Sequence, residues 1–420
     1  MKTAAAFFIA FRYLLGRAKE GGRYLRGAAA GIALSLIPIV VTLIVADGMI
    51  RGITDRYLEL GTGHLQIYNY IDPLGFEPVI NSVKEQKNVR GVWQEADGLG
   101  ILVGSLASRG ATIRAVENSF WDDEGSRKFL QTISGDGRLG SGREVLLGEE
   151  LARLTGVQAG GTVRIMTIST GPGGRLIPRV TSFTVRGIVS SGYRELDSLW
   201  CIMNFEEGIK ILPVTTPVYL MLKINDPYTG ADRTAEVLSQ KLGPGYGIYT
   251  WKSLQSAQYS SYESTRQLLL FIMALIVVVA SVNVSSATSM LAIERRRDIA
   301  VLKTGGASTA FTGAIFLWGA FLTGLAGSIV GLGAGLLIGY NINALLHGLE
   351  IFLSFFTAIF NAEPVRILNS GYYLEKIPVI INIPAIIAIG FFTVLCSVLA
   401  SWIPARRAGK LKPIEILRKY

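Results

Sequence analysis

The most regular feature of the sequence is a set of four long apolar runs. The runs cover residues 27–49, 267–291, 311–346 and 383–403. An uncharged apolar run of about 18 or more residues is typical of a helix that crosses a bilayer. The pattern therefore predicts four transmembrane helices. The third run is long enough for two spans to be considered, but it has no turn signal in its middle, so one long or tilted helix is favoured.

The charged residues between these runs predict their orientation. Cytoplasmic loops are enriched in Lys and Arg, and residues 1–26, 292–310 and 404–420 together hold sixteen Lys and Arg against four acidic residues. These segments contribute +12, which leaves −2 of the total net charge of +10 for the rest of the chain. Both termini and the middle segment are therefore expected in the cytoplasm, with 50–266 and a short loop at 347–382 on the other side. The excess of Lys and Arg therefore reflects the orientation of the spans, and no nucleic-acid partner is expected.

Two shorter features add to this picture. The stretch 4–15 is apolar with a single Arg and is followed by charged residues, which predicts a short amphipathic helix on the cytoplasmic membrane surface. The third run is rich in small residues, which predicts close packing against another helix. Its repeated glycines are Gly324, Gly327, Gly331, Gly333 and Gly335.

Residues 50–266 are numerous enough for an independent domain, and their pattern mixes strands with helices. Alternating stretches predict strands at 64–70, 163–168, 183–189, 218–224 and 247–251. Short helices are predicted at 78–87, 149–154 and 231–241. Glycines interrupt 89–116, which predicts a meander of hairpins. The expected fold class is a membrane protein with four transmembrane α-helices and a large α+β domain, outside the cytoplasm, between helices 1 and 2.

Composition and motifs weigh against several function classes. Only 17% of the residues are charged, against about 25% in soluble domains. Cys201 and Cys396 are too few for a disulfide framework, and His64 and His347 have no partners at ligand spacing, so no metal site is predicted. We find no pattern of catalytic residues. The sequence lacks GxxxxGK[ST], so nucleotide binding by this chain is not expected, and no cofactor is predicted.

Several segments together resemble a known family. They are IERRRDIAVLKTGGAS at 293–308, VLLGEELARLTGVQAGGTVRI at 145–165, FTVRGIVSSGYRELDS at 183–198, YYLEKIPV at 372–379 and IPARRAGKLKPIEILR at 403–418. With the order of one span, a large domain and three spans, they resemble the FtsX/MacB-type permeases of ABC transporters. Nearly end to end, the chain looks like the lipoprotein-releasing LolC/LolE group. It departs at Gly160–Gly161, where that group often has Gly-Asp, in a turn.

The resemblance implies a function and a set of partners. In this family two permease subunits, similar or identical, pair in the membrane, and two copies of a separate ABC ATPase bind them in the cytoplasm and hold the ATP and Mg²⁺. The pair takes a triacylated lipoprotein from the outer leaflet of the bacterial inner membrane and passes it to a periplasmic carrier. The large domain is expected to receive or relay this cargo.

The loop after the second run is the leading candidate site. Its basic residues anchor the preceding span in any case, and the resemblance gives it a further role as a coupling helix that docks on the ATPase. Gly305–Gly306 would end this helix and Ser308 would cap the next one. Ile299 and Leu302 are expected to face the partner, and a bulky charge at Ala300 or Leu302 is expected to uncouple it. The candidate residues are Glu294, Arg295, Arg296, Arg297, Asp298, Ile299, Ala300, Leu302, Lys303 and Gly306.

Further candidates lie in the spans and in the tail. Pro38 is either a tolerated kink or a residue of a lipid-accepting cleft between two permeases. Asn283 is either an interhelical hydrogen-bond donor or a second residue of that cleft. The tail from Pro413 through Ile414, Ile416 and Leu417 is either a charge anchor or a second contact with the ATPase.

Two other functions stay open at this stage. One is the permease of a peptide or antibiotic exporter, although the best-known exporters of this type carry a fused ATPase. The other is a non-transporting FtsX-like protein that signals across the membrane to a periplasmic wall hydrolase. Such proteins have smaller outer domains, and the YYLEKIPV segment resembles the lipoprotein-releasing group instead.

Overall fold

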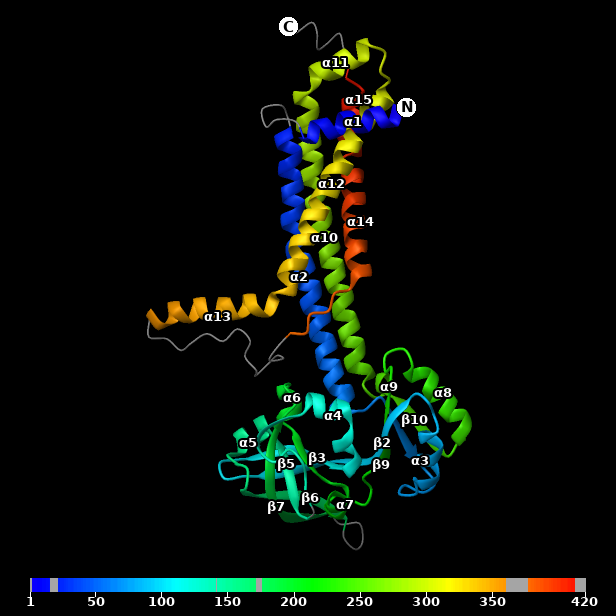
Figure 1. Ribbon diagram of the computed structural model, residues 1–420, viewed down its shortest axis with the longest axis vertical. Coiled ribbons are helices and arrows are strands. Elements are labelled where there is room, and N and C mark those ends of the chain that lie inside the picture. The colour runs from blue at the N-terminus through cyan, green and yellow to red at the C-terminus, as the bar shows by residue number, and fades with distance from the viewer. Residues whose placement is uncertain (1, 16–21, 141, 171–175, 360–376, 412–420) are drawn as a thin grey trace. The chain divides into compact units, whose positions relative to one another are not determined.

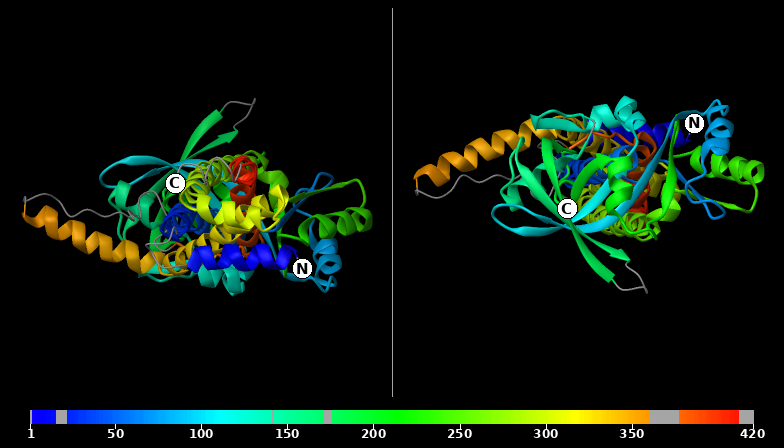
Figure 2. Two further views of the ribbon diagram at one scale, coloured as in Figure 1. Left: turned by 90° about the horizontal axis from the view of Figure 1, so that it is seen from above. Right: turned by 90° about the horizontal axis from the view of Figure 1, so that it is seen from below.

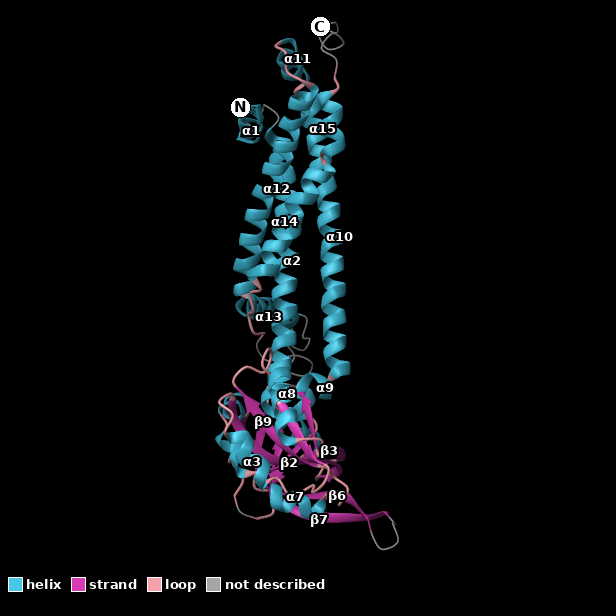
Figure 3. Cartoon of the chain, turned by 90° about the vertical axis from the view of Figure 1, so that its right-hand side faces the viewer, coloured by secondary structure: helices cyan, strands magenta, loops and turns pink. Residues whose placement is uncertain are grey.

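The chain forms two compact units. The computed structural model describes residues 2–15, 22–140, 142–170, 176–359 and 377–411, and the statements below concern these residues. The membrane unit consists of the described residues up to Gly48, of Tyr262–Phe352, and of those from Ile377 onward. The outer domain consists of Met49–Ser261 together with residues 353–359. Figure 3 shows that the strands are confined to the outer domain.

Four of the described helices are long and apolar enough to cross a bilayer. They are α2 (Gly22–Arg56), α10 (Ser256–Glu294), α12 (Thr309–Tyr340) and α14 (Ile383–Ala400). Figure 1 shows them side by side, and the end-on views in Figure 2 show them gathered into one bundle. The predicted fold class, four spans with an α+β domain between the first and the second, is confirmed.

Glycines on one face of α12 bring its backbone against α2. A Cβ built at Gly331 would lie 2.8 Å from the Cα atom of Ala33, and one built at Gly327 would lie 2.7 Å from the carbonyl oxygen of Ala29. Gly335 and Gly339 continue the row at intervals of four residues, which keeps them on the same face. The helices therefore meet through their backbones, as small-residue motifs permit.

The two remaining glycines of the predicted set behave differently. A Cβ at Gly324 would lie 3.0 Å from the side chain of Ser397. This glycine therefore allows the close approach of α14, and not of α2. A Cβ at Gly333 would meet none of the described atoms within 4 Å. Close packing is thus confirmed for four of the five predicted positions, and Gly333 lies on the exposed side of the helix.

The shorter helices are α1 (Lys2–Leu15), α11 (Arg296–Thr304), α15 (Trp402–Gly409) and α13 (Ile342–Ile359), of which α13 begins in the membrane unit and ends in residues grouped with the outer domain. The predicted N-terminal helix is thereby confirmed as a helix. It lies across the bundle in Figure 2, dark blue in the left view, and packs on α12 through Ala6 and Ala10.

The third apolar run differs from its prediction. A single helix was expected over 311–346 and a loop over 347–382, but α12 ends at Tyr340 and α13 continues to Ile359. Asn341 makes the break, because its side-chain amide donates to the carbonyl oxygen of Leu337 and its backbone N–H donates to the carbonyl oxygens of Leu337 and Ile338. These bonds satisfy groups that a helix end otherwise leaves open.

The strands of the outer domain form one continuous network with a closed part. The network contains β1 (Leu65–Asn69), β2 (Val89–Val103), β3 (Ser108–Val116), β4 (Gln131–Gly135), β5 (Glu144–Gly148), β6 (Thr162–Thr170), β7 (Leu176–Ser190), β8 (Trp200–Asn204), β9 (Val218–Ile224) and β10 (Tyr246–Thr250). The order is β10-β1-β9-β2-β3-β8-β5-β7-β4, and β6 pairs with both β7 and β2. The strands β2, β3, β8, β5, β7 and β6 therefore close into a ring, and β2 links this ring to the small sheet β10-β1-β9.

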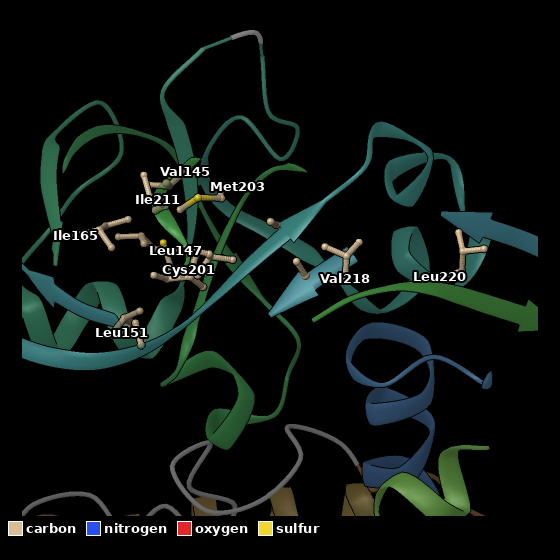
Figure 4. Close-up of a cluster of buried hydrophobic side chains, with 14 of the residues drawn as sticks. Val145, Leu147, Leu151, Ile165, Cys201, Met203, Ile211, Val218 and Leu220 are labelled. Atoms are coloured by element: carbon tan, nitrogen blue, oxygen red, sulfur yellow. The ribbon is translucent and has the colours of Figure 1, made fainter. Parts of the chain in front are cut away.

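Short helices cover this network. They are η2 (Tyr57–Gly61), α3 (Glu77–Lys84), η3 (Asn118–Asp122), α4 (Glu124–Phe129), α5 (Glu149–Thr155), α6 (Arg194–Asp197), α7 (Phe205–Ile211), α8 (Ala231–Leu242) and α9 (Trp251–Leu254). The core lies between strands and helices, and Figure 4 shows Leu147, Ile165, Cys201 and Met203 within it. Cys201 and Cys396 are both free thiols, and they belong to different units.

The predicted meander at 89–116 is instead one hairpin of two long strands. Gly98 and Gly100 lie inside β2, where a Cβ would come within 2.3 Å of Leu212 and within 2.5 Å of Ile113. These glycines admit neighbouring side chains and do not form turns. Only Gly104 opens the turn, where its N–H donates to the carbonyl oxygen of Ala107.

The glycine row gives a direct test of the packing between α2 and α12. A Gly331→Leu substitution forces a side chain into a backbone contact, and overpacking of this kind costs about 1–3 kcal/mol. We therefore expect a lower thermal stability of the purified full-length protein in detergent. The matched control is Gly333→Leu, two residues away, which should leave the stability unchanged. Equal losses in both variants would contradict the close contact.

Candidate functional site

The candidate segment after the second span folds as a short helix between two spans. It begins after a break at Arg295, which follows α10, and ends at Gly305. Gly306 has a φ of +90°, in the left-handed region that favours glycine. The Ser308 hydroxyl then accepts the N–H of Phe311 and caps α12. The predicted termination and capping residues are confirmed.

One side of α11 is committed to this chain. Ile299 and Ala300 are only 2% and 1% exposed, and Ile299 packs with Leu25, Phe316 and Ala405. Lys303 donates to the carbonyl oxygen of Leu411 at 2.7 Å. Such contacts hold the segment in a defined position. The inward-facing or half-buried candidates are Arg295, Asp298, Ile299, Ala300, Leu302 and Lys303.

The other side of α11 faces away from the chain. Arg297, Val301 and Thr304 are exposed at intervals of four and three residues, which places them on one face. The expectation that Ile299 faces a partner is wrong, because it is buried in this chain, and the exposed apolar residue is Val301, at 67%. A charge at buried Ala300 would disturb this chain's own packing, so it does not isolate a docking effect. The outward-facing candidates are Glu294, Arg296, Arg297 and Gly306.

The remaining predicted residues are placed as follows. Pro38 lies within α2 and Asn283 within α10, and both side chains are exposed on the bundle. A Cβ on Gly31 of α2 would lie 3.9 Å from the Asn283 amide nitrogen, so Asn283 lies beside α2. The tail from Pro413 to Leu417 and most of the YYLEKIPV segment lie outside the described residues.

A second site, missed by the sequence analysis, lies where the first long helix ends in the outer domain. The helix α2 continues as η2, whose last carbonyl groups have no partner within the helix. Lys223 of β9 donates to the carbonyl oxygens of Leu58 and Glu59 at 2.7 and 2.6 Å. Arg114 of β3 donates to those of Leu60 and Gly61. Both cations are buried, and positive charge is favourable at this end of a helix dipole.

Carboxylates balance the two buried cations. Glu59 accepts from Lys223 at 2.9 Å and from Arg90 at 2.7 Å, and Arg90 also reaches Asp123. Glu95 pairs with Arg114 inside the core. Because a buried charge is costly unless it is paired and hydrogen-bonded, this network explains how the sheet holds Lys and Arg without exposure.

His64 completes the network as a neutral ring. Its Nδ1 atom accepts the backbone N–H of Ile224, so Nε2 carries the proton that faces Glu59 at 3.2 Å. Burial lowers the pKa of His64 below its ordinary 6.5, which keeps the ring neutral. Burial alone would raise the pKa of Glu59, but the bond from His64 and the charge of Lys223 outweigh it and hold that pKa below its ordinary value. Burial lowers the pKa of Lys223 to about 8.

The sequence does contain a signal for this second site. Lys223 is the one charge in the apolar strand segment VYLMLKI, at a position that lies inside the core. A charge in a strand buried on both faces requires a buried partner. The partner could not be found from the sequence, because Glu59 lies 164 residues away and meets Lys223 only after the sheet has formed.

The outer domain also has a cavity of about 680 Å³ beside η3 and the start of α7. Its lining includes Glu117, Trp121, Arg138, Asn204 and Glu206. Charged and polar groups suit a polar ligand and would leave acyl chains without apolar contact. This cavity is therefore not a candidate for binding a lipid chain.

The membrane part of the chain matches a family model. Residues 270–413, from α10 through α15, match the model described as FtsX-like permease C-terminal. This match covers the candidate segment α11 and the glycine-rich span α12. With the four spans and the intervening domain, it confirms the predicted resemblance to the FtsX-type permeases of ABC transporters.

Relatives extend the similarity over the whole chain. A Neisseria meningitidis protein described as lipoprotein-releasing system transmembrane protein LolC is 25% identical over 98% of both chains. The LolC protein of Xylella fastidiosa is 26% identical, again over 98% of both. The LolE protein of Haemophilus influenzae is 23% identical over 99% of both. Among solved structures, the periplasmic region of MacB from Actinobacillus actinomycetemcomitans matches with a TM-score of 0.30 at 18% identity, over 48% of this chain and 95% of that one.

The buried lysine yields a stability prediction. Lys223→Met removes the donor to two helix-end carbonyls and leaves Glu59 with one partner fewer, and breaking a buried pair costs about 3–5 kcal/mol. We expect a loss of that size in denaturant unfolding of the full-length protein, followed by tryptophan fluorescence. The control is Lys252→Met, which breaks an exposed pair with Asp232 and should cost no more than about 1 kcal/mol. A similar small loss in both would contradict the capping role.

The buried histidine yields a pH prediction. Because the folded pKa of His64 is lowered from 6.5, the unfolded chain binds more protons just below that pH, and the free energy of unfolding falls on acidification. Glu59, with a lowered pKa, adds a further loss below its ordinary 4.5. His64→Gln should flatten the decline between pH 7 and 5, measured by the same unfolding assay. His347→Gln, at the other histidine, should not, and an unchanged slope in His64→Gln would refute the assignment.

Proposed function

We propose that this chain is the permease subunit of an ATP-driven transporter that releases lipoproteins from the bacterial inner membrane. The observation that carries the proposal is similarity over at least 98% of the chain to proteins described as LolC and as LolE. The complex would contain two permease subunits and two copies of a separate ATPase. Its cargo, a triacylated lipoprotein, would pass from the outer leaflet to a periplasmic carrier.

The distribution of charge supports the orientation in this proposal. The basic segments flank the bundle at the N-terminus, at α11 and after α14. Under the positive-inside rule these segments lie in the cytoplasm, and the outer domain then lies in the periplasm. This arrangement puts α11 on the side where ATP is available and the outer domain on the side where lipoproteins leave.

The energetics of the cargo favours an apolar path through a protein. Three acyl chains carry on the order of 45 methylenes, each worth about 0.8 kcal/mol when buried. Exposing them to water would cost tens of kcal/mol, so the chains must move from lipid to an apolar surface and then to an apolar carrier. The exposed faces of α2 and α10 offer such a surface, with Leu34, Phe271 and Val279. Pro38 and Asn283 lie on these same helices, which supports their assignment to the cleft.

The two sides of α11 support a coupling role for this segment. The inner side of α11 packs against α1 and α12 of the membrane unit. A displacement of α11 would therefore be transmitted directly to the spans. Its outer side combines the exposed Val301 with Arg297 and Arg296, an apolar centre with a basic rim. This pattern fits a protein partner better than lipid alone, since interface cores are apolar and their rims polar.

The coupling proposal predicts the effect of a charge at Val301. Val301→Glu would bury an unpaired carboxylate at the docking surface, which costs more than about 1.4 kcal/mol, and each 1.4 kcal/mol is a factor of ten in affinity. We expect roughly tenfold or weaker binding of the ATPase subunit and loss of cargo-stimulated ATP hydrolysis in the reconstituted complex. Val214→Glu, at a 95% exposed valine of the outer domain, is the control. Full stimulation in Val301→Glu would refute docking at α11.

The cargo assignment is tested in cells. Depletion of this chain should leave lipoproteins in the inner-membrane fraction, and wild-type protein should restore their sorting. Sorting by the Val301→Glu variant should fail, while the Val214→Glu variant should restore it. Normal lipoprotein fractionation during depletion would contradict the proposed cargo and would favour an exporter or a signalling role for the same permease architecture.

A further inference from the structure

The helix α13, directly after the third span, carries its polar residues in one narrow stripe. These residues are Asn343, His347, Glu350, Ser354 and Thr357, spaced alternately by four and three positions. At 100° per residue they occupy an arc of roughly 80°. The rest of the helix surface consists of Leu, Ile, Phe, Ala and Gly. A helix with such a wide apolar arc needs an apolar environment along most of its circumference.

The apolar arc of α13 is exposed in this chain. Leu345, Leu349, Ile351, Phe352 and Phe355 are each between 43% and 66% exposed. On the polar side, Asn343, Glu350, Ser354 and Thr357 are half-buried, and His347 is exposed. The apolar side is thus the more exposed side along most of the helix, the reverse of a helix that faces water.

Contacts within the membrane unit fix the start of α13 at one end of the spans. The Asn343 side chain donates to the carbonyl oxygen of Ile377 at 2.9 Å and accepts its N–H at 3.0 Å. The next residue, Pro378, lies against Gly48, where a Cβ would come within 2.0 Å of its carbonyl oxygen. The first turn of α13 is therefore tied to the segment before α14, and α12 ends only at Tyr340. The residues that make these contacts all lie at or next to the ends of the membrane spans.

The number of spans and the positions of the basic segments decide whether α13 crosses the bilayer or lies on its surface. With α13 as a fifth span, α14 would run the other way and the basic segment after it would lie outside the cytoplasm, against the positive-inside rule. The polar stripe along its whole length is also unsuited to a lipid-embedded span. A position of α13 in the membrane interface is compatible with both its polar stripe and the distribution of basic residues.

We propose that α13 is an interfacial helix that binds the outer leaflet of the bilayer, with Leu345, Phe352 and Phe355 inserted among the acyl chains. The polar stripe then faces the headgroups and the protein. The contact continues the lipid-facing surface of α12, from which α13 is separated by Asn341 alone. This surface anchors the non-cytoplasmic end of the third span to the lipid, independently of any cargo.

The proposal is tested with fluorescent probes on the full-length protein in phospholipid vesicles. In a background with Cys201→Ala and Cys396→Ala, single cysteines are placed by Phe352→Cys, by Phe355→Cys and, as the matched control on the polar stripe, by His347→Cys. Each is labelled with an environment-sensitive fluorophore. We expect probes at 352 and 355 to lose fluorescence with lipids carrying a doxyl group near the headgroup and to resist aqueous iodide. The probe at 347 should be quenched by iodide and should lose less fluorescence with these lipids than the other two probes.

Two results would overturn the proposal. Quenching of all three probes by iodide would show that α13 lies in water. Protection of positions 352 and 355 from both quenchers would show that protein, such as a second copy of the chain, covers the apolar face. Two probe positions on one arc guard against a label that perturbs a single site. The assay does not depend on lipoprotein release, so its outcome is separate from that of the functional test.

Discussion

Two buried cations bind the end of the helix η2 inside the outer domain. A helix end leaves carbonyl groups open, and in a packed core these would be as costly as any unpaired polar group. Here Lys223 and Arg114 reach them from β9 and β3, strands that are far apart in sequence. The carboxylates Glu59 and Glu95 then balance the charge. The register of the sheet, the neutral state of His64 and the position of the helix end are therefore parts of one network.

The same chain uses charge for a different purpose in the basic segments at its N-terminus, around α11 and after α14. There the Lys and Arg residues favour one direction of the spans under the positive-inside rule, and most of those that the structure describes are exposed. Within α11 this division can be followed residue by residue. Lys303 is tied to the backbone of Leu411, whereas Arg296 and Arg297 face outward. A short helix that is packed on one side and exposed on the other is suited to passing a force from a partner to the bundle.

Local patterns in the sequence were sufficient for much of the fold. The four spans, the strand segments of the outer domain and the Gly306–Ser308 boundary follow from hydrophobic period, charge and turn chemistry. Glycine was less reliable, because Gly98 and Gly100 admit neighbouring side chains inside a strand and Gly333 faces outward beside a packed row. The inward side of α11 and the Lys223 network depend on contacts across more than a hundred residues. Such contacts produce only a weak local pattern in the sequence, such as a single lysine in an apolar strand.

The glycine row between α2 and α12 restricts how this membrane unit can move. Side chains that interdigitate can change rotamer and let two helices slide, but backbones in contact have no such freedom. The pair therefore has few internal degrees of freedom, and a displacement of α12 carries α2 with it. Relative motion within the bundle is then left to helices that meet through side chains, α10 foremost among them.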